Sequence, residues 1–281
     1  FIAQHIPSEQ IMLAKKEYEK TTGETYEDDK SYNTRMSLFL EWYLLDNYKP
    51  GTQKTILESI TENNQSAWNQ SHLEVCQDIA NNIQALFEVK KVRDNSVTVL
   101  DLLKNKKYQI DDKDSKLIFR KNDIFQGRVV FHHDKSHFTG HFCFHPNKSH
   151  RFIRDEAKKL FLMQLSWNKE LSSFEKELSK INKSSLKNLK CIKKINTKIE
   201  CTNFATIKDR FLNEVLKREE DNKLFETSTQ EIENKIFLLQ NETIKIKGRR
   251  LISELINKLS YMHLKWERSR QIEISDIYKN Q

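Results

Sequence analysis

The sequence LFEVKKVRDNSVTVL occupies residues 86–100, and along much of it apolar and polar residues alternate. Alternation with period two is typical of a β-strand, because successive side chains point to opposite faces of a sheet. Asp94-Asn95 interrupts the pattern near its middle and favours a tight turn. The stretch therefore predicts a β-hairpin.

Short apolar runs separated by turn residues continue this pattern to about residue 145. In order, the segments are a turn at 104–106, a strand at 108–110, a charged excursion at 111–116, an apolar run at 117–119, a turn at 122–123, a strand at 124–131, a polar turn at 132–136 and a last strand at 138–145. Five short strands joined by tight turns predict a small half-open barrel of SH3-like or OB-like kind. An ordinary antiparallel meander is the alternative.

Helical periodicity flanks this β segment on both sides. We expect helices from Ser8, over 32–48, after the N-cap candidate Thr52, up to residue 84, over 152–199 as a helical hairpin or coiled coil, and over 203–218, 228–246 and 249–270, with a docked tail at 272–278. Only five Gly and three Pro occur in the 281 residues, which favours helices over an architecture built on many turns. The predicted fold class is α+β, with a helical region at 1–84, a five-stranded antiparallel barrel at 85–147 and a long helical region at 148–281.

Charge is distributed unevenly along the chain. Residues 1–80 carry 7 basic and 13 acidic side chains, residues 81–150 carry 13 and 8, and residues 151–281 carry 28 and 19, so the net charges are -6, +5 and +9. A basic C-terminal half favours contact with nucleic acid or another acidic partner. The alternative is that the acidic front packs against the basic remainder.

Two basic surfaces are candidates for nucleic-acid contact, because cations hold phosphates and aromatic rings stack on bases. The first is the final helix, with Arg249, Arg250, Lys258, Lys265, Arg268 and Arg270 beside Tyr261, His263 and Trp266. The second is the barrel, with Lys90, Lys91, Arg93, Lys104, Lys106, Lys107, Arg120, Lys121 and Arg128 on strands or turns. For the final helix the competing interpretation is an amphipathic helix whose arginines are exposed or paired with Glu254, Glu267 and Glu273.

Metal ligation has one weak candidate, the alternating residues His141, Cys143 and His145, with His137 or His150 as a fourth ligand. Adjacent same-face groups along one strand lie about 7 Å apart, a distance that strains a shared tetrahedral ion. In the competing interpretation Phe142 and Phe144 face the core and the histidines face solvent. We predict no bound cofactor.

The sequence lacks the motifs of several enzyme classes. The glycines at 23, 51, 127, 140 and 248 form no phosphate-binding loop, and G-x-S-x-G, H-E-x-x-H and C-x-x-C are absent. Asp111, Asp112 and Asp114 lie among lysines and are expected in a solvated loop. No apolar run reaches about 18 residues, so no membrane span is expected. Four widely spaced cysteines favour a location of the protein in the reducing cytoplasm.

A resemblance to a known group covers roughly residues 35–155. The segments that carry it are Phe39-Leu40-Glu41-Trp42, Leu86-Phe87-Glu88-Val89, Val97–Leu103, Tyr108-Gln109-Ile110, Asn122-Asp123-Ile124-Phe125, Gly127-Arg128-Val129 and Phe144-His145-Pro146. In this order they resemble a small barrel between helices in uncharacterised bacterial proteins, some of which carry a SEC-C zinc motif. The four cysteines here do not supply that motif's paired ligands, and the resemblance implies no catalytic residues.

These observations favour a non-enzymatic binding protein that contacts RNA or a ribonucleoprotein through its basic C-terminal helices and the barrel. The alternative is a protein-interaction or scaffold component that oligomerises through its long helices. A metal-dependent enzyme built on the histidine cluster is the third hypothesis.

Overall fold

A computed structural model describes residues 6–48, 52–111, 113, 115–133, 135–181, 236, 240–269 and 271–280. The chain forms two compact units, Phe1–Leu162 with Arg249–Gln281, and Met163–Gly248. This division differs from the three regions expected from the sequence. Apolar residues within 152–160, 251–266 and 274–278 belong to the same core cluster as the barrel, whereas the buried apolar residues of the N-terminal helices form two further clusters.

Four helices precede the sheet: α1 (Ser8–Thr22), α2 (Tyr32–Leu45), α3 (Ile56–Asn63) and α4 (Gln70–Ala80). Large apolar residues of α1 and α2 pack together, with Tyr18 and Phe39 rings 5.6 Å apart. The helix expected after Thr52 starts later, because Thr55 is the N-cap and forms a capping box with Glu58.

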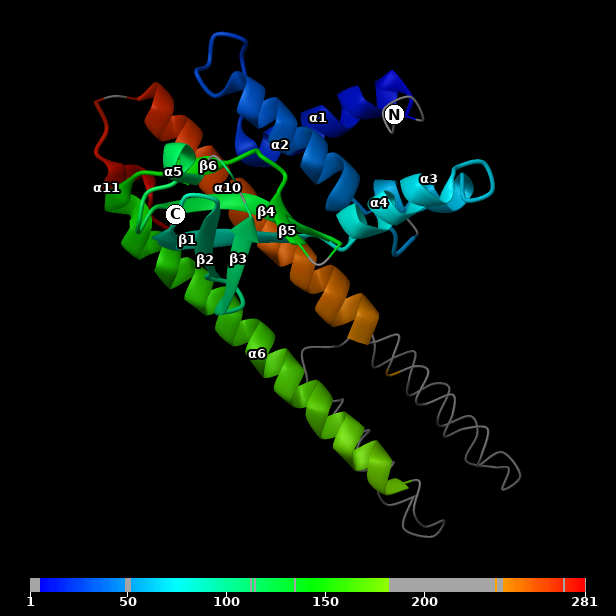
Figure 1. The fold of residues 1–281 in the computed structure, drawn as a ribbon. Helices are drawn as coiled ribbons and strands as arrows, with labels where there is room; N and C mark the ends of the chain where they lie inside the picture. The colour runs from blue at the N-terminus through cyan, green and yellow to red at the C-terminus, as the bar shows by residue number, and fades with distance from the viewer. Residues whose placement is uncertain are drawn as a thin grey trace. The chain divides into compact units, whose positions relative to one another are not determined.

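The sheet is antiparallel throughout and curls into a half-barrel (Figure 1). Its strands are β1 (Ile83–Val92), β2 (Ser96–Asp101), β3 (Lys106–Asp111), β4 (Ile124–His132), β5 (Lys135–Phe138) and β6 (Cys143–His145). The order across the sheet is β3-β2-β1-β4, with β5 and β6 successively along the free edge of β4. The predicted fold class, α+β with a small antiparallel half-barrel between helical regions, is confirmed; within the described residues the sheet has six strands, because the last predicted strand is divided in two.

Two details of the predicted strands are wrong. Leu117 and Ile118 belong to a short helix, α5 (Ser115–Ile118), and not to an extended run. The last strand predicted over 138–145 is two strands, because the chain leaves the sheet between β5 and β6 at Gly140, whose φ is +92°. The chain then returns over Gly127, where an added Cβ would lie 3.2 Å from the rings of Phe125 and Phe142.

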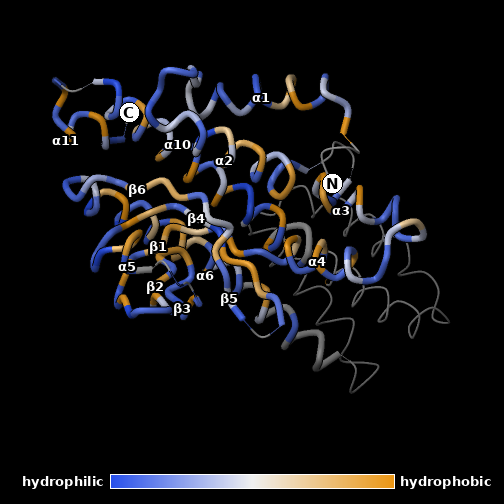
Figure 2. Tube along the Cα trace, turned by 45° about the horizontal axis from the view of Figure 1, so that its top comes forward, coloured by the Kyte–Doolittle hydropathy of each residue, from blue (hydrophilic) through white to orange (hydrophobic). Residues whose placement is uncertain are grey.

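Aromatic side chains fill the inside of the half-barrel. Phe87, Phe119, Phe125 and Phe138 lie with ring centroids 5.1–5.8 Å apart in the contacting pairs. Apolar residues, orange in Figure 2, recur along the strands that carry these rings. Because the packed rings exclude water from the concave face, any ligand site on the barrel lies outside this core.

The outer face of the sheet is covered by α6 (His150–Ile181) and α10 (Gly248–Arg268). Five consecutive residues of β1 and six of β4 are buried, since both faces of these strands are covered. Polar residues on this covered face have partners: Ser260 Oγ of α10 donates to Gln126 Oε1 at 2.9 Å. The tail also docks, as expected: α11 (Ile274–Ile277) follows α10, and Ile277 and Tyr278 are buried in the barrel core cluster.

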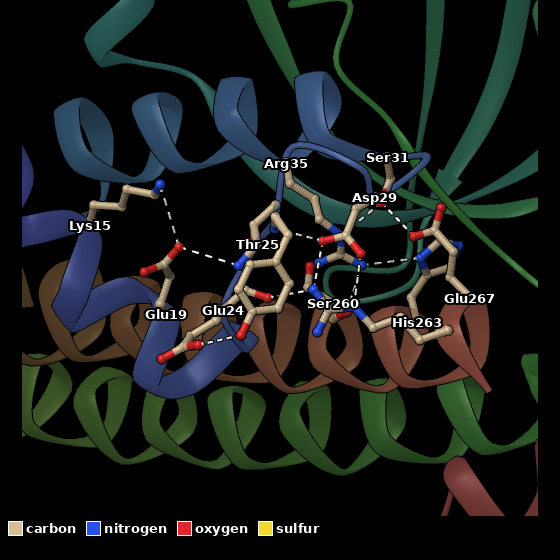
Figure 3. A network of polar contacts seen from close by, with 12 residues as sticks. Lys15, Glu19, Glu24, Thr25, Asp29, Ser31, Arg35, Ser260, His263 and Glu267 are labelled. Atoms are coloured by element: carbon tan, nitrogen blue, oxygen red, sulfur yellow. Dashed lines mark hydrogen bonds and ion pairs between the residues drawn. The ribbon is translucent and has the colours of Figure 1, made fainter.

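A polar network joins α2 to α10, as Figure 3 shows. Arg35 donates to the Ser260 carbonyl at 3.1 Å and lies 3.3 Å from His263 Nδ1. Ser31 Oγ donates to Glu267 Oε2 at 2.5 Å. Burial, followed by the charge of Arg35, lowers the pKa of His263 to about 4. The N-terminal helical region therefore contacts the final helix, here through Arg35 and Ser31, neither of which is acidic.

The second unit contains α6 from Met163 onward and a π-helix, η3 (Gln240–Lys247). Trp167 is buried, and Lys247 Nζ lies 5.2 Å from its ring centroid. The helix predicted at 203–218, most of that at 228–246, and the continuation of α6 toward residue 199 fall outside the described residues. Among described helices, none has the length and apolar character needed to cross a bilayer.

Candidate functional site

A basic groove opens on the barrel between the end of β1 and the chain around α5. Its volume is about 750 Å³, and its lining consists of Lys90, Lys91, Val92, Lys116, Phe119, Arg120 and Lys121. Five of these seven residues are cations. We call this surface the basic groove.

The basic groove lies where β1 runs past the start of β4. Pairing with β4 ends at Glu88, opposite Ile124. Beyond that point the turn before β4 takes over: Val89 N–H donates to the Asp123 carbonyl and Asn122 N–H donates to the Val89 carbonyl, both at 2.9 Å. The register with β2 shifts between Val89 and Lys91, so Lys90 is a bulge residue. A bulge redirects side chains locally and leaves neighbouring lysines at one edge.

The far wall of the basic groove is held by one carboxylate. Asp123 Oδ2 accepts a hydrogen bond from Arg120 N–H at 2.9 Å and so closes the turn at 120–123. Asn122 within it has φ +72°, a left-handed conformation that Asn tolerates better than most residues. The turn fixes Arg120 and Lys121 opposite Lys91.

Two of the five groove cations are paired. Lys90 Nζ lies 2.7 Å from Glu88 Oε1, and Arg154 of α6 binds the other oxygen of Glu88 at 3.3 Å. Burial alone would raise the pKa of Glu88, but the hydrogen bonds from both cations outweigh it and lower the pKa. Lys116 pairs with Asp94 of the β1–β2 turn.

The other three cations, Lys91, Arg120 and Lys121, are exposed. Within the part of the chain that the structure describes, no acidic side chain lies within salt-bridge distance of any of them. Clustered like charges of this kind, unpaired among the described residues, have the sign that complements an extended polyanion.

The cations predicted on the final helix are engaged within the protein. Arg268 binds both oxygens of Asp29 at 2.6 and 2.8 Å and donates to the Glu24 carbonyl. The others contact the Ala80 carbonyl (Arg249), the Tyr48 ring (Arg250), Glu156 and Asn280 (Lys258) and the Tyr261 ring (Lys265). Arg270 lies outside the described residues. The alternative interpretation expected exposed arginines or pairing with Glu254, Glu267 and Glu273, whereas the partners observed here are other residues.

Residues 2–189 match the model of a family of unknown function, DUF7986. The chain belongs to this family. The matched range contains the whole half-barrel and the basic groove, whereas α10 and α11 lie beyond it. No curated protein and no solved structure matches the chain. The resemblance to SEC-C-associated proteins stays a prediction.

The barrel cations predicted from the sequence occupy three different places. Lys90 and Lys91 line the basic groove. Lys106 and Lys107 are exposed on β3 opposite Asp101 and Leu100, several residues further along the sheet, and Lys106 lies over the Tyr108 ring. Of these two pairs, Lys90 and Lys91 belong to the candidate site, as do the predicted barrel cations Arg120 and Lys121.

Arg128 is the clear error among the predicted nucleic-acid contacts. Its side chain is 2% exposed and binds Asp46 through both terminal nitrogens, Asn82 at 2.5 Å and Glu41 at 3.3 Å. Burial alone would lower its pKa, but the two carboxylates raise it. A partner outside the protein cannot reach this guanidinium while the chain is folded.

The residues of the weak metal candidate are directed to separate partners. His141 Nδ1 lies 3.0 Å from Glu41 Oε1, and His145 Nδ1 lies 3.1 Å from the Tyr278 hydroxyl. Cys143 is buried, and burial raises its thiol pKa to about 12. Among described residues no three His, Cys, Asp or Glu side chains are close enough to share a metal ion. His145 is buried, so the competing interpretation that the histidines face solvent was wrong for this residue.

Sequence reasoning missed Lys116 as a groove residue, because it stands among aspartates in a segment expected to be a solvated loop. Arg120 and Lys121 were recognised as barrel cations but not as neighbours of Lys91. The signal available was the turn Asn122-Asp123, which brings the residues before it back toward β1.

Proposed function

We propose that this protein binds RNA through the basic groove, by contacts with the sugar–phosphate backbone. The observation that carries the proposal is the group of three exposed cations, Lys91, Arg120 and Lys121, without an acidic partner among the described residues. Phosphate attraction of this kind needs no base recognition and supplies most non-specific nucleic-acid affinity. A cytoplasmic location, where RNA is abundant, belongs to the same proposal.

Salt dependence gives the first test. Each phosphate neutralised on a single strand contributes a slope of about -0.7 to log K against log salt, so three contacts predict about -2 and five about -3.5. Fluorescence anisotropy with a labelled 20-nucleotide RNA between 50 and 300 mM salt measures this slope. No binding at 50 mM salt would overturn the proposal.

Charge reversal gives the second test. The triple variant Lys91→Glu, Arg120→Glu, Lys121→Glu is expected to abolish RNA binding at 100 mM salt. The matched control reverses Lys16, Lys135 and Lys158, which are exposed cations outside the groove, and changes net charge equally. If both triple variants weaken binding to the same extent, attraction is diffuse and the basic groove is not the site.

Self-association is a second candidate function, favoured by one observation on α6. Leu162, Met163 and Leu165 are exposed there by 51%, 37% and 36%. Neighbouring apolar residues on a helix surface are typical of helix-pairing faces. Light scattering at increasing protein concentration measures the mass, and a constant monomer would contradict this alternative.

A further inference from the structure

An apolar tip adjoins the basic groove. Leu117 and Ile118 end the short helix α5 and are 86% and 39% exposed. They stand between Lys116 and Phe119, which both line the groove, so chain connectivity places the two aliphatic side chains at its rim. We call this pair the α5 tip.

The α5 tip differs from a scattered surface leucine in its surroundings. Single exposed apolar residues are ordinary on protein surfaces. Here, two consecutive ones adjoin in sequence a groove whose lining holds five cations and the apolar residue Val92. A ligand that fills the groove therefore meets a charged side and an apolar side together.

We infer that the basic groove takes single-stranded rather than duplex RNA; this inference rests on the proposed function. In a duplex the bases are stacked inside and the outer surface offers phosphates and sugars, so an aliphatic tip gains little. In a single strand the bases are unstacked and present apolar faces while the phosphates remain available to cations. Lys91, Arg120 and Lys121 together with the α5 tip match the surface of a single strand.

The same geometry predicts weak discrimination between bases. Phe119, the one aromatic residue of the groove lining, is 2% exposed and packs against Phe125 and Phe138. No ring of the lining is therefore free to stack, and base contact falls to the aliphatic α5 tip, which fits any base face.

The test compares a 20-nucleotide oligo(U) with a duplex of the same length at 100 mM salt. Wild type is expected to bind the single strand more tightly. Leu117→Ser is expected to weaken single-strand binding by about five-fold, as partial loss of one buried leucine contact predicts, and to leave duplex binding unchanged. Leu13→Ser on α1, at a residue 68% exposed, is the matched control. Unchanged urea midpoints establish that both variants fold.

The outcomes separate the two proposals. Equal affinity for both RNA forms, or equal effects of Leu117→Ser and Leu13→Ser, would overturn the single-strand inference and leave a phosphate-binding groove. Absence of binding to either RNA would overturn the proposed function as well. Leu117-dependent binding to phosphatidylserine vesicles without RNA binding would assign the α5 tip to a lipid surface and overturn both.

Discussion

Arg128 and the cations of the basic groove lie on the same half-barrel but in opposite surroundings. Arg128 is enclosed by Asp46, Asn82 and Glu41, whereas Lys91 and Lys121 face solvent without an acidic partner among the described residues. A buried charge is tolerated only when it is paired, so Arg128 fastens the N-terminal helical region to β4. The fold does not require the groove charges, which leaves them available to a ligand.

Removing Arg128 should have the largest effect. Arg128→Met leaves Asp46 and Glu41 buried without their cation, and breaking such a pair costs about 3–5 kcal/mol of unfolding free energy. Urea denaturation followed by circular dichroism measures the loss. Lys91→Met is the contrasting variant, with an expected change within about 0.5 kcal/mol because its side chain is exposed. Similar stability losses in both variants would contradict the distinction drawn here.

The next largest effect is expected from acid, which should lower the stability of the folded protein through its buried histidines. His263 has a folded pKa of about 4, below its ordinary value of 6.5, so between these values the unfolded chain binds more protons. Stability is therefore complete above pH 6.5 and is lost as pH falls toward 4, by on the order of 3 kcal/mol. Burial also lowers the pKa of His145, which adds to the same direction.

Urea midpoints at pH 7.5, 6.0 and 4.5 test this dependence. The variant His263→Gln should lose less stability than wild type over this range, because a glutamine side chain does not titrate. A variant as acid-sensitive as wild type would show that other groups carry the effect.

The smallest effect is expected for Arg268, whose side chain is 35% exposed. Its hydrogen bond lowers the pKa of Asp29, and Arg268→Gln should cost about 0.2–1 kcal/mol, as is typical of surface ion pairs. RNA affinity should stay unchanged, since this cation is engaged within the protein. A double-mutant cycle with Asp29→Asn measures the contribution of the ion pair to stability. Weaker RNA binding by Arg268→Gln would indicate that the final helix belongs to the RNA interface.

The α+β class and most of the elements follow from periodicity, because period-two and helical patterns change sharply near residues 84 and 146. Periodicity does not reveal whether the polar residues on β1 and β4 are buried or exposed. Glu88, Gln126 and Arg128 alternate with apolar residues as solvent-facing groups do, yet α6, α10 and the N-terminal helices cover them. Partners far away in sequence decided their burial.

The basic groove was equally hidden from sequence reasoning. Its cations could be recognised one by one, but their proximity depends on a bulge at Lys90 and on the stagger between β1 and β4. Alternation predicts strands, not the residue at which pairing stops. The short helix α5 was missed because three aspartates and two lysines around it suggested a solvated loop.

The cover that α10 provides has a consequence for biosynthesis. About 100 residues separate the last strand from α10, so at roughly 5–20 residues per second the ribosome needs on the order of 5–20 s to supply them. During this interval Gln126 and the outer face of β4 lack their contacts with Ser260 and its neighbours on α10. The outer face of β4 therefore stays uncovered by α10 for several seconds during synthesis, so the barrel has to form before its own cover is available.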